Sequence, residues 1–178
     1  QWGLGRSTPM EQIAFGVDIP RSKEKLRAAA RSICNMWKDE FFEEHSEFLD
    51  FPARMITPKP YQYPHPPVWQ ATGGAEGAAS VGAAGLGVLL FTVMDTVDNL
   101  KKNIDAYREA QETAKVLTDV HTNQAAAFTM VHCVEDRSQL EQNRVWESVW
   151  WWYRHLVEFA RKWEGKEVQE AQDKGLFH

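Results

Sequence analysis

Residues 64–92 read PHPPVWQATGGAEGAASVGAAGLGVLLFT, and this stretch decides the fold. Proline lacks an N–H donor, so a strand begins only after Pro67 and covers Val68 to Ala71. Glycines then open a short helix of small residues, which ends at Gly85 as its C′ residue. A second apolar strand follows the helix. The order strand, glycine turn, helix, strand predicts a parallel βαβ unit.

The glycine turn between the first strand and the helix is a candidate anion site. It contains Gly73, Gly74 and Gly77. Glycines let the backbone approach an anion closely, and the free N–H groups of a first helical turn point toward it. Parallel α/β folds bind ligands at this edge of the sheet. A tight turn without any ligand is the alternative interpretation of the same glycines.

The composition excludes several classes of protein. The chain has 178 residues, enough for a single domain over residues 1–178. It carries 20 Lys and Arg against 25 Asp and Glu, with no basic patch of the kind that binds nucleic acid. No apolar run has the length of a membrane span, and we expect a cytoplasmic protein without a signal peptide. The first residue is Gln1 rather than Met, so the chain is expected to begin inside a fold.

The cysteines and histidines do not predict a metal site. Cys34 and Cys133 lie far apart in the sequence, and we expect two free, buried thiols. Metal-ligand spacing is likewise absent from His121, His132 and His155. We interpret His65, which lies between prolines, as a structural histidine bonded to nearby backbone rather than a catalytic base. Trp69 alternates away from its strand neighbours, and we expect it to pack under a helix.

Strands and helices alternate along the chain. Strands are expected over residues 1–5, 68–71, 86–92 and 124–134. Helices are expected over 21–40, over the small-residue run that ends before Gly85, from Asp95 or Thr96 onward, and from Ser138 to about Gly165. Pro20 suits the first turn of the helix over 21–40, with Asp18 as a candidate cap. Residues 38–67, rich in proline and aromatic side chains, are expected to form an ordered excursion within the domain.

This alternation predicts a parallel sheet with helices outside it. Four strand–helix units make half of an eight-stranded barrel, which needs about 250 residues. The chain is therefore expected to be a partial barrel, with an open α/β sheet as the alternative.

Three motifs follow one another in the first half of the chain. They are Gly3-Leu4-Gly5-Arg6, the run Pro58-Lys59-Pro60-Tyr61-Gln62-Tyr63-Pro64-His65-Pro66-Pro67, and the turn Ala71-Thr72-Gly73-Gly74. Their order and spacing resemble the bacterial-luciferase-like family of flavin-dependent monooxygenases, and the proline-rich run is the most specific part. That resemblance implies a (β/α)8 TIM barrel, of which this chain would hold about strands four to seven.

The resemblance also implies a cofactor, a reaction and partners. Members of the family bind reduced FMN, or the deazaflavin F420 in one branch, and use molecular oxygen to oxidise a small organic substrate. A separate flavin reductase would supply the reduced FMN, and the complete protein would be a homo-oligomer, such as a dimer. No catalytic residue is assigned, because in this chemistry the flavin carries the reactivity.

By the same resemblance, the flavin phosphate is bound by Arg6 and by a loop that contains Thr72, Gly73, Gly74 and Gly77. A guanidinium and backbone N–H groups both suit a dianion. Many members carry serine in this loop where this chain has glycine, so backbone donors are expected here. An ion pair between Arg6 and Glu11 is the alternative role of the arginine.

Phe91 and Thr92 end the next strand, and we expect them to line the flavin or substrate pocket, with core packing as the alternative. Two other functions are open: a shortened flavin-binding protein without turnover, and a barrel of unrelated chemistry that binds phosphate by analogy only.

Overall fold

The computed structural model describes residues 1–7, 9–92 and 95–163 of the chain. The chain divides into two compact units. The first contains residues 1–6 and 20–129, and the second contains residues 7–19 and 130–178. The single domain over residues 1–178 stays a prediction.

A parallel sheet forms the centre of the first unit. Its strands follow the order β1-β4-β5-β6, and each neighbouring pair is parallel. The strands are β1 (Trp2–Leu4), β4 (Val68–Ala71), β5 (Gly87–Phe91) and β6 (Ala125–Phe128). The predicted α/β class with a parallel sheet is confirmed. The strand expected over 124–134 stops at Phe128, because its partner β5 ends at the paired residue Phe91.

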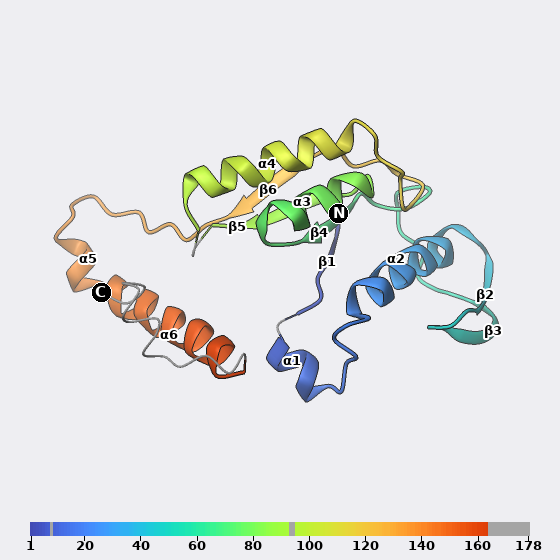
Figure 1. Cartoon of the computed structure of the whole chain (residues 1–178), viewed down its shortest axis with the longest axis horizontal. Helices are drawn as coiled ribbons and strands as arrows, with labels where there is room; N and C mark the ends of the chain where they lie inside the picture. The colour runs from blue at the N-terminus through green and yellow to red at the C-terminus, as the bar shows by residue number, and fades with distance from the viewer. Residues whose placement is uncertain (8, 93–94, 164–178) are drawn as a thin grey trace. The chain divides into compact units, whose positions relative to one another are not determined.

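Three helices accompany this sheet: α2 (Ser22–Lys38), α3 (Gly74–Ala83) and α4 (Val97–Gln111). Helices α3 and α4 contact each other and lie next to β4, β5 and β6 (Figure 1). The sequence signals at the ends of α3 and α4 are confirmed. Gly85 adopts a φ of 66° just after α3, and the Thr96 side chain caps α4 by accepting a hydrogen bond from Asn99 N at 3.1 Å.

Helix α2 begins at Ser22, one residue after the expected start, but the roles predicted for Pro20 and Asp18 are wrong. Pro20 lies in a turn before the helix, and Arg21 is the N-cap residue, without a side-chain capping bond. Arg21 instead binds Glu24 and Glu47 through its guanidinium. An ion-paired arginine thus stands at the position where the sequence predicted Asp18.

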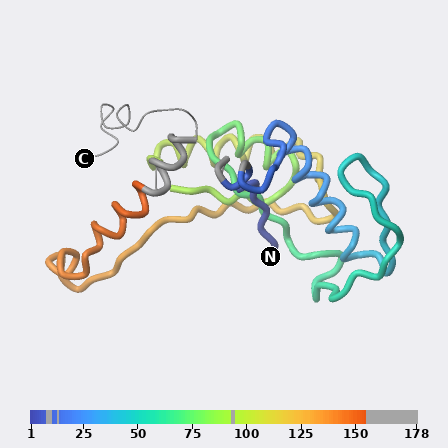
Figure 2. Tube along the Cα trace, turned by 90° about the horizontal axis from the view of Figure 1, so that it is seen from below, coloured from blue at the N-terminus to red at the C-terminus, as the bar shows by residue number. Residues whose placement is uncertain are grey.

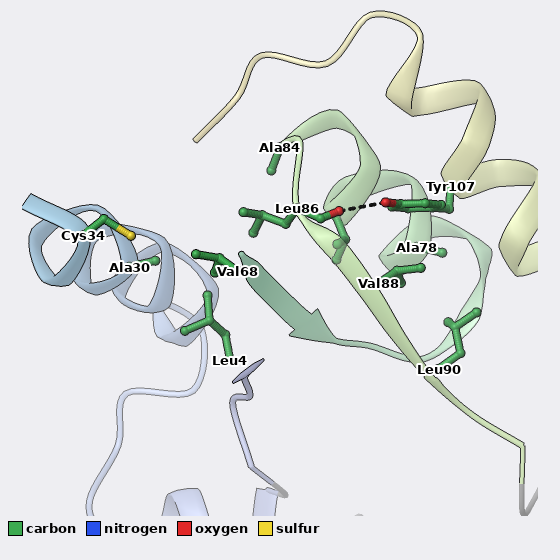
Figure 3. Close-up of a cluster of buried hydrophobic side chains, with 11 residues drawn as sticks. Leu4, Ala30, Cys34, Val68, Ala78, Ala84, Leu86, Val88, Leu90 and Tyr107 are labelled. Carbon is green, nitrogen blue, oxygen red and sulfur yellow. Dashed lines mark hydrogen bonds between the residues drawn. The ribbon is translucent and has the colours of Figure 1, made fainter. Parts of the chain in front are cut away.

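The hydrophobic core lies between the sheet and its helices (Figure 3). Its buried members are Leu4, Ala30, Cys34, Val68, Ala78, Val81, Ala84, Leu86, Val88, Leu90 and Tyr107. The Tyr107 hydroxyl donates to the carbonyl oxygens of Leu86 and Thr122, at 3.0 and 3.1 Å. Burial raises the pKa of Tyr107, so this phenol remains a proton donor over the whole neutral range. One side chain therefore joins α4 to the starts of β5 and β6.

Trp69 does not pack under a helix as predicted. Val68 and Val88 belong to the core cluster that contains Ala78 and Val81 of α3. Trp69 points to the opposite face of β4, where its indole lies over Gly87: a Cβ on Gly87 would stand 2.6 Å from Trp69 Cδ2. The side chains alternate along β4 as expected, but Val68 and not Trp69 faces the core that contains α3 residues.

The excursion over residues 38–67 contains an antiparallel hairpin that the sequence did not reveal, formed by β2 (Phe41–His45) and β3 (Asp50–Met55). The hairpin lies beside α2 (Figure 2), where Ser32 Oγ donates to Glu44 Oε2 at 2.8 Å. Most of its side chains are exposed, so neither strand has the apolar alternation that predicts a half-buried strand.

The proline-rich run is attached to the rest of the first unit at two points. Lys59 Nζ donates to the carbonyl oxygens of Met36 and Asp39 at the end of α2, at 2.5 and 2.6 Å. His65 is buried; its Nδ1 lies 2.9 Å from the Pro66 carbonyl oxygen, and its Nε2 accepts from Asp119 N at 3.2 Å. The structural role predicted for His65 is confirmed.

The second unit is helical in the part that the structure describes. Its helices are α1 (Pro9–Ala14), α5 (Gln139–Gln142) and α6 (Val145–Trp163), and α1 contacts α6. The single helix expected from Ser138 is interrupted at Arg144, which has a φ of 51°. The helix end expected near Gly165 lies outside the described residues.

Both cysteines are free, and Cys34 is buried as predicted, but Cys133 is exposed. Cys133 follows β6 in a segment without secondary structure, so the apolar run around it does not enter a core. Among the described helices, we find none with the length and hydropathy that a membrane crossing requires.

Candidate functional site

The carboxyl ends of three neighbouring strands bring the predicted binding residues to one edge of the sheet. Leu4 at the end of β1 pairs with Gln70, and Ala71 at the end of β4 pairs with Leu89. Arg6 follows β1 by two residues and Thr72 follows β4 directly. Because parallel strands end at the same edge, the Arg6 backbone and the glycine loop lie at neighbouring positions. Phe91 and Thr92 stand at the end of the next strand.

The glycine turn presents its backbone to open space. Gly73 is the N-cap of α3, in an extended conformation, and no side chain caps this helix. Gly74 has a φ of 73°, a backbone conformation that favours glycine. A Cβ added at Gly73 or Gly74 would meet no atom within 4 Å. The first N–H groups of α3 are therefore accessible to a ligand, as the anion interpretation requires.

Thr72 and Gly77 are in direct contact. A Cβ on Gly77 would overlap the Thr72 hydroxyl oxygen and would stand 3.3 Å from Thr72 Cβ. The hydroxyl therefore lies against the bare Cα of Gly77, in the first turn of α3. Thr72 N donates to Leu89 O at 3.1 Å, which fixes the backbone on which this side chain stands. The hydroxyl itself makes no hydrogen bond to the part of the chain that the structure describes.

Arg6 is exposed, and its guanidinium contacts the start of α2. Arg6 Nη1 donates to the hydroxyl oxygen of the buried Ser22 at 3.3 Å. The strand register brings the Arg6 backbone beside the glycine loop, whereas the contact that we measure for its side chain is to Ser22. Glu76, in the first turn of α3, adds a negative charge at the same helix end.

Phe91 and Thr92 both contact Phe128, a residue that the sequence analysis missed. The rings of Phe91 and Phe128 stack with centroids 5.3 Å apart and planes inclined by 7°. Thr92 donates to the Phe128 carbonyl oxygen twice, from N at 3.0 Å and from Oγ1 at 2.8 Å. Phe128 was overlooked because the strand was expected to continue to Val134, which hid its position at a strand end.

These residues form a donor set that suits a phosphate monoester. Backbone N–H groups and one hydroxyl lie at the sheet edge, the Arg6 backbone follows the neighbouring strand, and the glycines leave space for the ligand. The oxygens of doubly charged phosphate groups are bound by the same kinds of donor at the N-termini of helices in other proteins. The residues present therefore fit the phosphate end of FMN. Within the described ranges we find no group of three His, Cys, Asp or Glu that could bind a metal ion.

Comparison with known proteins identifies the family. A family model described as luciferase-like monooxygenase matches residues 1–177. The chain belongs to the luciferase-like monooxygenase family. The resemblance inferred from the three sequence motifs is thereby confirmed.

One curated protein and one solved structure are similar to this luciferase-like chain. The FMNH2-dependent dimethylsulfone monooxygenase of Pseudomonas putida is 33% identical over 88 residues, which cover 49% of this chain and 23% of that protein. The crystal structure of monooxygenase RslO1 from Streptomyces bottropensis matches 97% of this chain and 50% of its own, with a TM-score of 0.64 and 22% identity. The luciferase-like chain thus spans half or less of each protein.

Proposed function

We propose that this chain is part of a flavin-dependent monooxygenase that uses reduced FMN and molecular oxygen on a small organic substrate. The family membership supports the general reaction, and the name of the Pseudomonas putida relative supports reduced FMN as the cofactor. A flavin reductase would then be the source of reduced FMN. From the same family membership we propose a (β/α)8 barrel, in which this chain supplies about strands four to seven as one domain. The complete protein would be a homodimer in the cytoplasm.

The chain's own residues would bind and orient the flavin. The N–H groups of the turn at Gly73 and Gly74, with Arg6, would bind the phosphate. Phe91, Thr92 and Phe128 would line the pocket at the ends of the next two strands and exclude water from it. When bound, reduced flavin supplies the electrons for the reaction with oxygen. The observation that supports this proposal is the shared sheet edge, where the Arg6 backbone and the exposed turn at Gly73 and Gly74 follow neighbouring strands.

The test compares two ligands that differ only in the phosphate. FMN and riboflavin are titrated against the full 178-residue chain and against Arg6→Ala. Loss of a charge-assisted contact is expected to weaken FMN binding by about tenfold or more, while riboflavin binding stays unchanged. Arg54→Ala serves as the matched control, because Arg54 is an exposed arginine on β3. Equal affinity of both ligands for the parent chain would refute the phosphate site, and a parallel F420 titration separates the two flavin classes.

A further inference from the structure

The proposed site contains a glycine whose role differs from that of its neighbours. Gly73 and Gly74 face open space, so their lack of a side chain leaves room for a ligand. The space beside Gly77 is already filled by the Thr72 side chain, whose hydroxyl oxygen would overlap a Cβ at this position. No ligand atom can use that space while Thr72 keeps its conformation.

We propose that Gly77 is a positioning residue, which seats the Thr72 hydroxyl against the first turn of α3 so that the hydroxyl joins the backbone donors to the flavin phosphate. This inference rests on the proposed function. It divides the loop into residues that contact the ligand and one that acts through a neighbour. A hydroxyl is both a donor and an acceptor, and Thr72 makes no hydrogen bond with its hydroxyl to any described residue, so its O–H is available for a phosphate oxygen.

The geometry explains why this position requires glycine. Gly77 lies inside α3, where alanine is the better helix former. Glycine there weakens the helix, but an alanine methyl would overlap the Thr72 hydroxyl. The Thr72 backbone is held by its N–H bond to Leu89, so relief would come from rotation of the side chain. Gly77→Ala would therefore move the hydroxyl without touching the ligand.

The first experiment measures thermal unfolding of the full chain without ligand. Gly77→Ala should lower Tm when Thr72 is present and raise it in a T72A background, where the overlap is gone and the helix preference of alanine remains. A glycine required for a reason unrelated to Thr72 would give the same sign in both backgrounds. Ala79→Gly, farther along α3, is the control for helix preference alone. The same sign in both backgrounds overturns the proposal.

The second experiment measures affinity for FMN and for riboflavin. Gly77→Ala and Thr72→Val should each weaken FMN binding about tenfold, the double variant should be no worse than either, and riboflavin binding should not change. Additive losses, or FMN affinity unchanged in Thr72→Val, would overturn the proposal. The Thr72→Val result decides the matter even where Gly77→Ala does not fold.

The phosphate site and the positioning role of Gly77 can fail separately. If Arg6→Ala weakens FMN binding while Gly77→Ala does not, the positioning role alone is wrong. If the parent chain binds FMN and riboflavin equally, the phosphate site itself is wrong, and the role of Gly77 fails with it.

Discussion

Among single residues, Ser22 has a consequence for Arg6 that the sequence does not suggest. Its hydroxyl lies in the first turn of α2, is buried, and accepts a hydrogen bond from the Arg6 guanidinium. A long, exposed side chain is held in this way near the end of β1. Because its rotamers are already restricted, Arg6 loses less side-chain conformational entropy when it binds an anion.

Ser22→Ala is expected to weaken FMN binding about fivefold, which corresponds to a hydrogen bond of about 1 kcal/mol. In the R6A background the same substitution should have no further effect on FMN, because the group that it orients is gone. Titration of FMN against the four combinations measures this coupling, and Ser46→Ala in the β2–β3 turn is the control. Equal losses with and without Arg6 would contradict an orienting role.

The two cysteines differ in their chemistry. Burial, assisted by the charge of Asp119, raises the pKa of the Cys34 thiol to about 11. At pH 8 Cys34 therefore carries about 100-fold less thiolate than an ordinary cysteine. Cys133 is exposed.

Alkylation by iodoacetamide at pH 8 should modify Cys133 at least 100-fold faster than Cys34, as followed by mass spectrometry. Cys133→Ser should leave only the slow reaction. A fast reaction that survives in Cys133→Ser would show that Cys34 is accessible.

The raised pKa of Cys34 also makes stability depend on pH. The native thiol stays protonated below its raised pKa, so Cys34 should stabilise the fold fully below about pH 9 and lose that contribution as the pH approaches 11.

At the scale of elements, Lys59 gives the proline-rich run a structural role. Its ammonium group binds two carbonyl oxygens at the carboxyl end of α2, where the helix dipole is negative and these oxygens lack partners within the helix. The run that is most specific to the family is thus attached to a helix end.

Lys59→Met keeps the aliphatic chain and removes the charge. It should lower the free energy of unfolding by about 1 kcal/mol and speed amide hydrogen exchange in the loop that follows α2. Lys23→Met, at the positive end of the same helix, should leave stability unchanged or slightly raised. Urea unfolding of the two variants checks this, and equal effects would contradict a capping role for Lys59.

Local signals in the sequence predict some elements and not others. The glycine turn, Gly85 and Thr96 mark the boundaries of α3 and α4, because each supplies a conformation or a cap that few other residues supply. The β2–β3 hairpin has no such signal: Pro52 lies within β3 and few of its residues are buried. The break at Arg144 is equally hidden, since a positive φ is uncommon for arginine.

The candidate site divides in the same way. Strand order placed Arg6, the glycine loop and Phe91 at a common edge, because parallel strands end together. Phe128 and Ser22 could not be found, since each enters the site through a tertiary contact with no counterpart in the local pattern.

At the scale of the whole molecule, the sheet of the first unit has β1 and β6 as its outer strands. Every residue of β6 is exposed. Outer strands with unpaired backbone groups favour association with another strand, and a charge on the strand opposes it.

The full 178-residue chain is therefore expected to self-associate in a concentration-dependent manner, and Ala126→Lys on β6 should reduce the associated fraction several-fold. Ala83→Lys places the same charge on the exposed end of α3 and is the control. Sedimentation velocity over a range of concentrations measures the outcome. A parent chain that is monomeric throughout, or an Ala126→Lys variant that matches Ala83→Lys, would contradict it.

The amino and carboxyl ends of the strands in the parallel sheet differ in how much the core depends on them. At the amino ends of the strands, Gly87 lies beneath the Trp69 indole and Tyr107 bonds the starts of two strands, so we expect substitutions there to destabilise the core. At the carboxyl edge, Gly73 and Gly74 border empty space. Mutations that change which ligand is recognised can thus accumulate at the carboxyl ends of the strands, while the residues at the amino ends maintain the fold. Descendants of this chain can therefore diversify in specificity without first acquiring compensating changes.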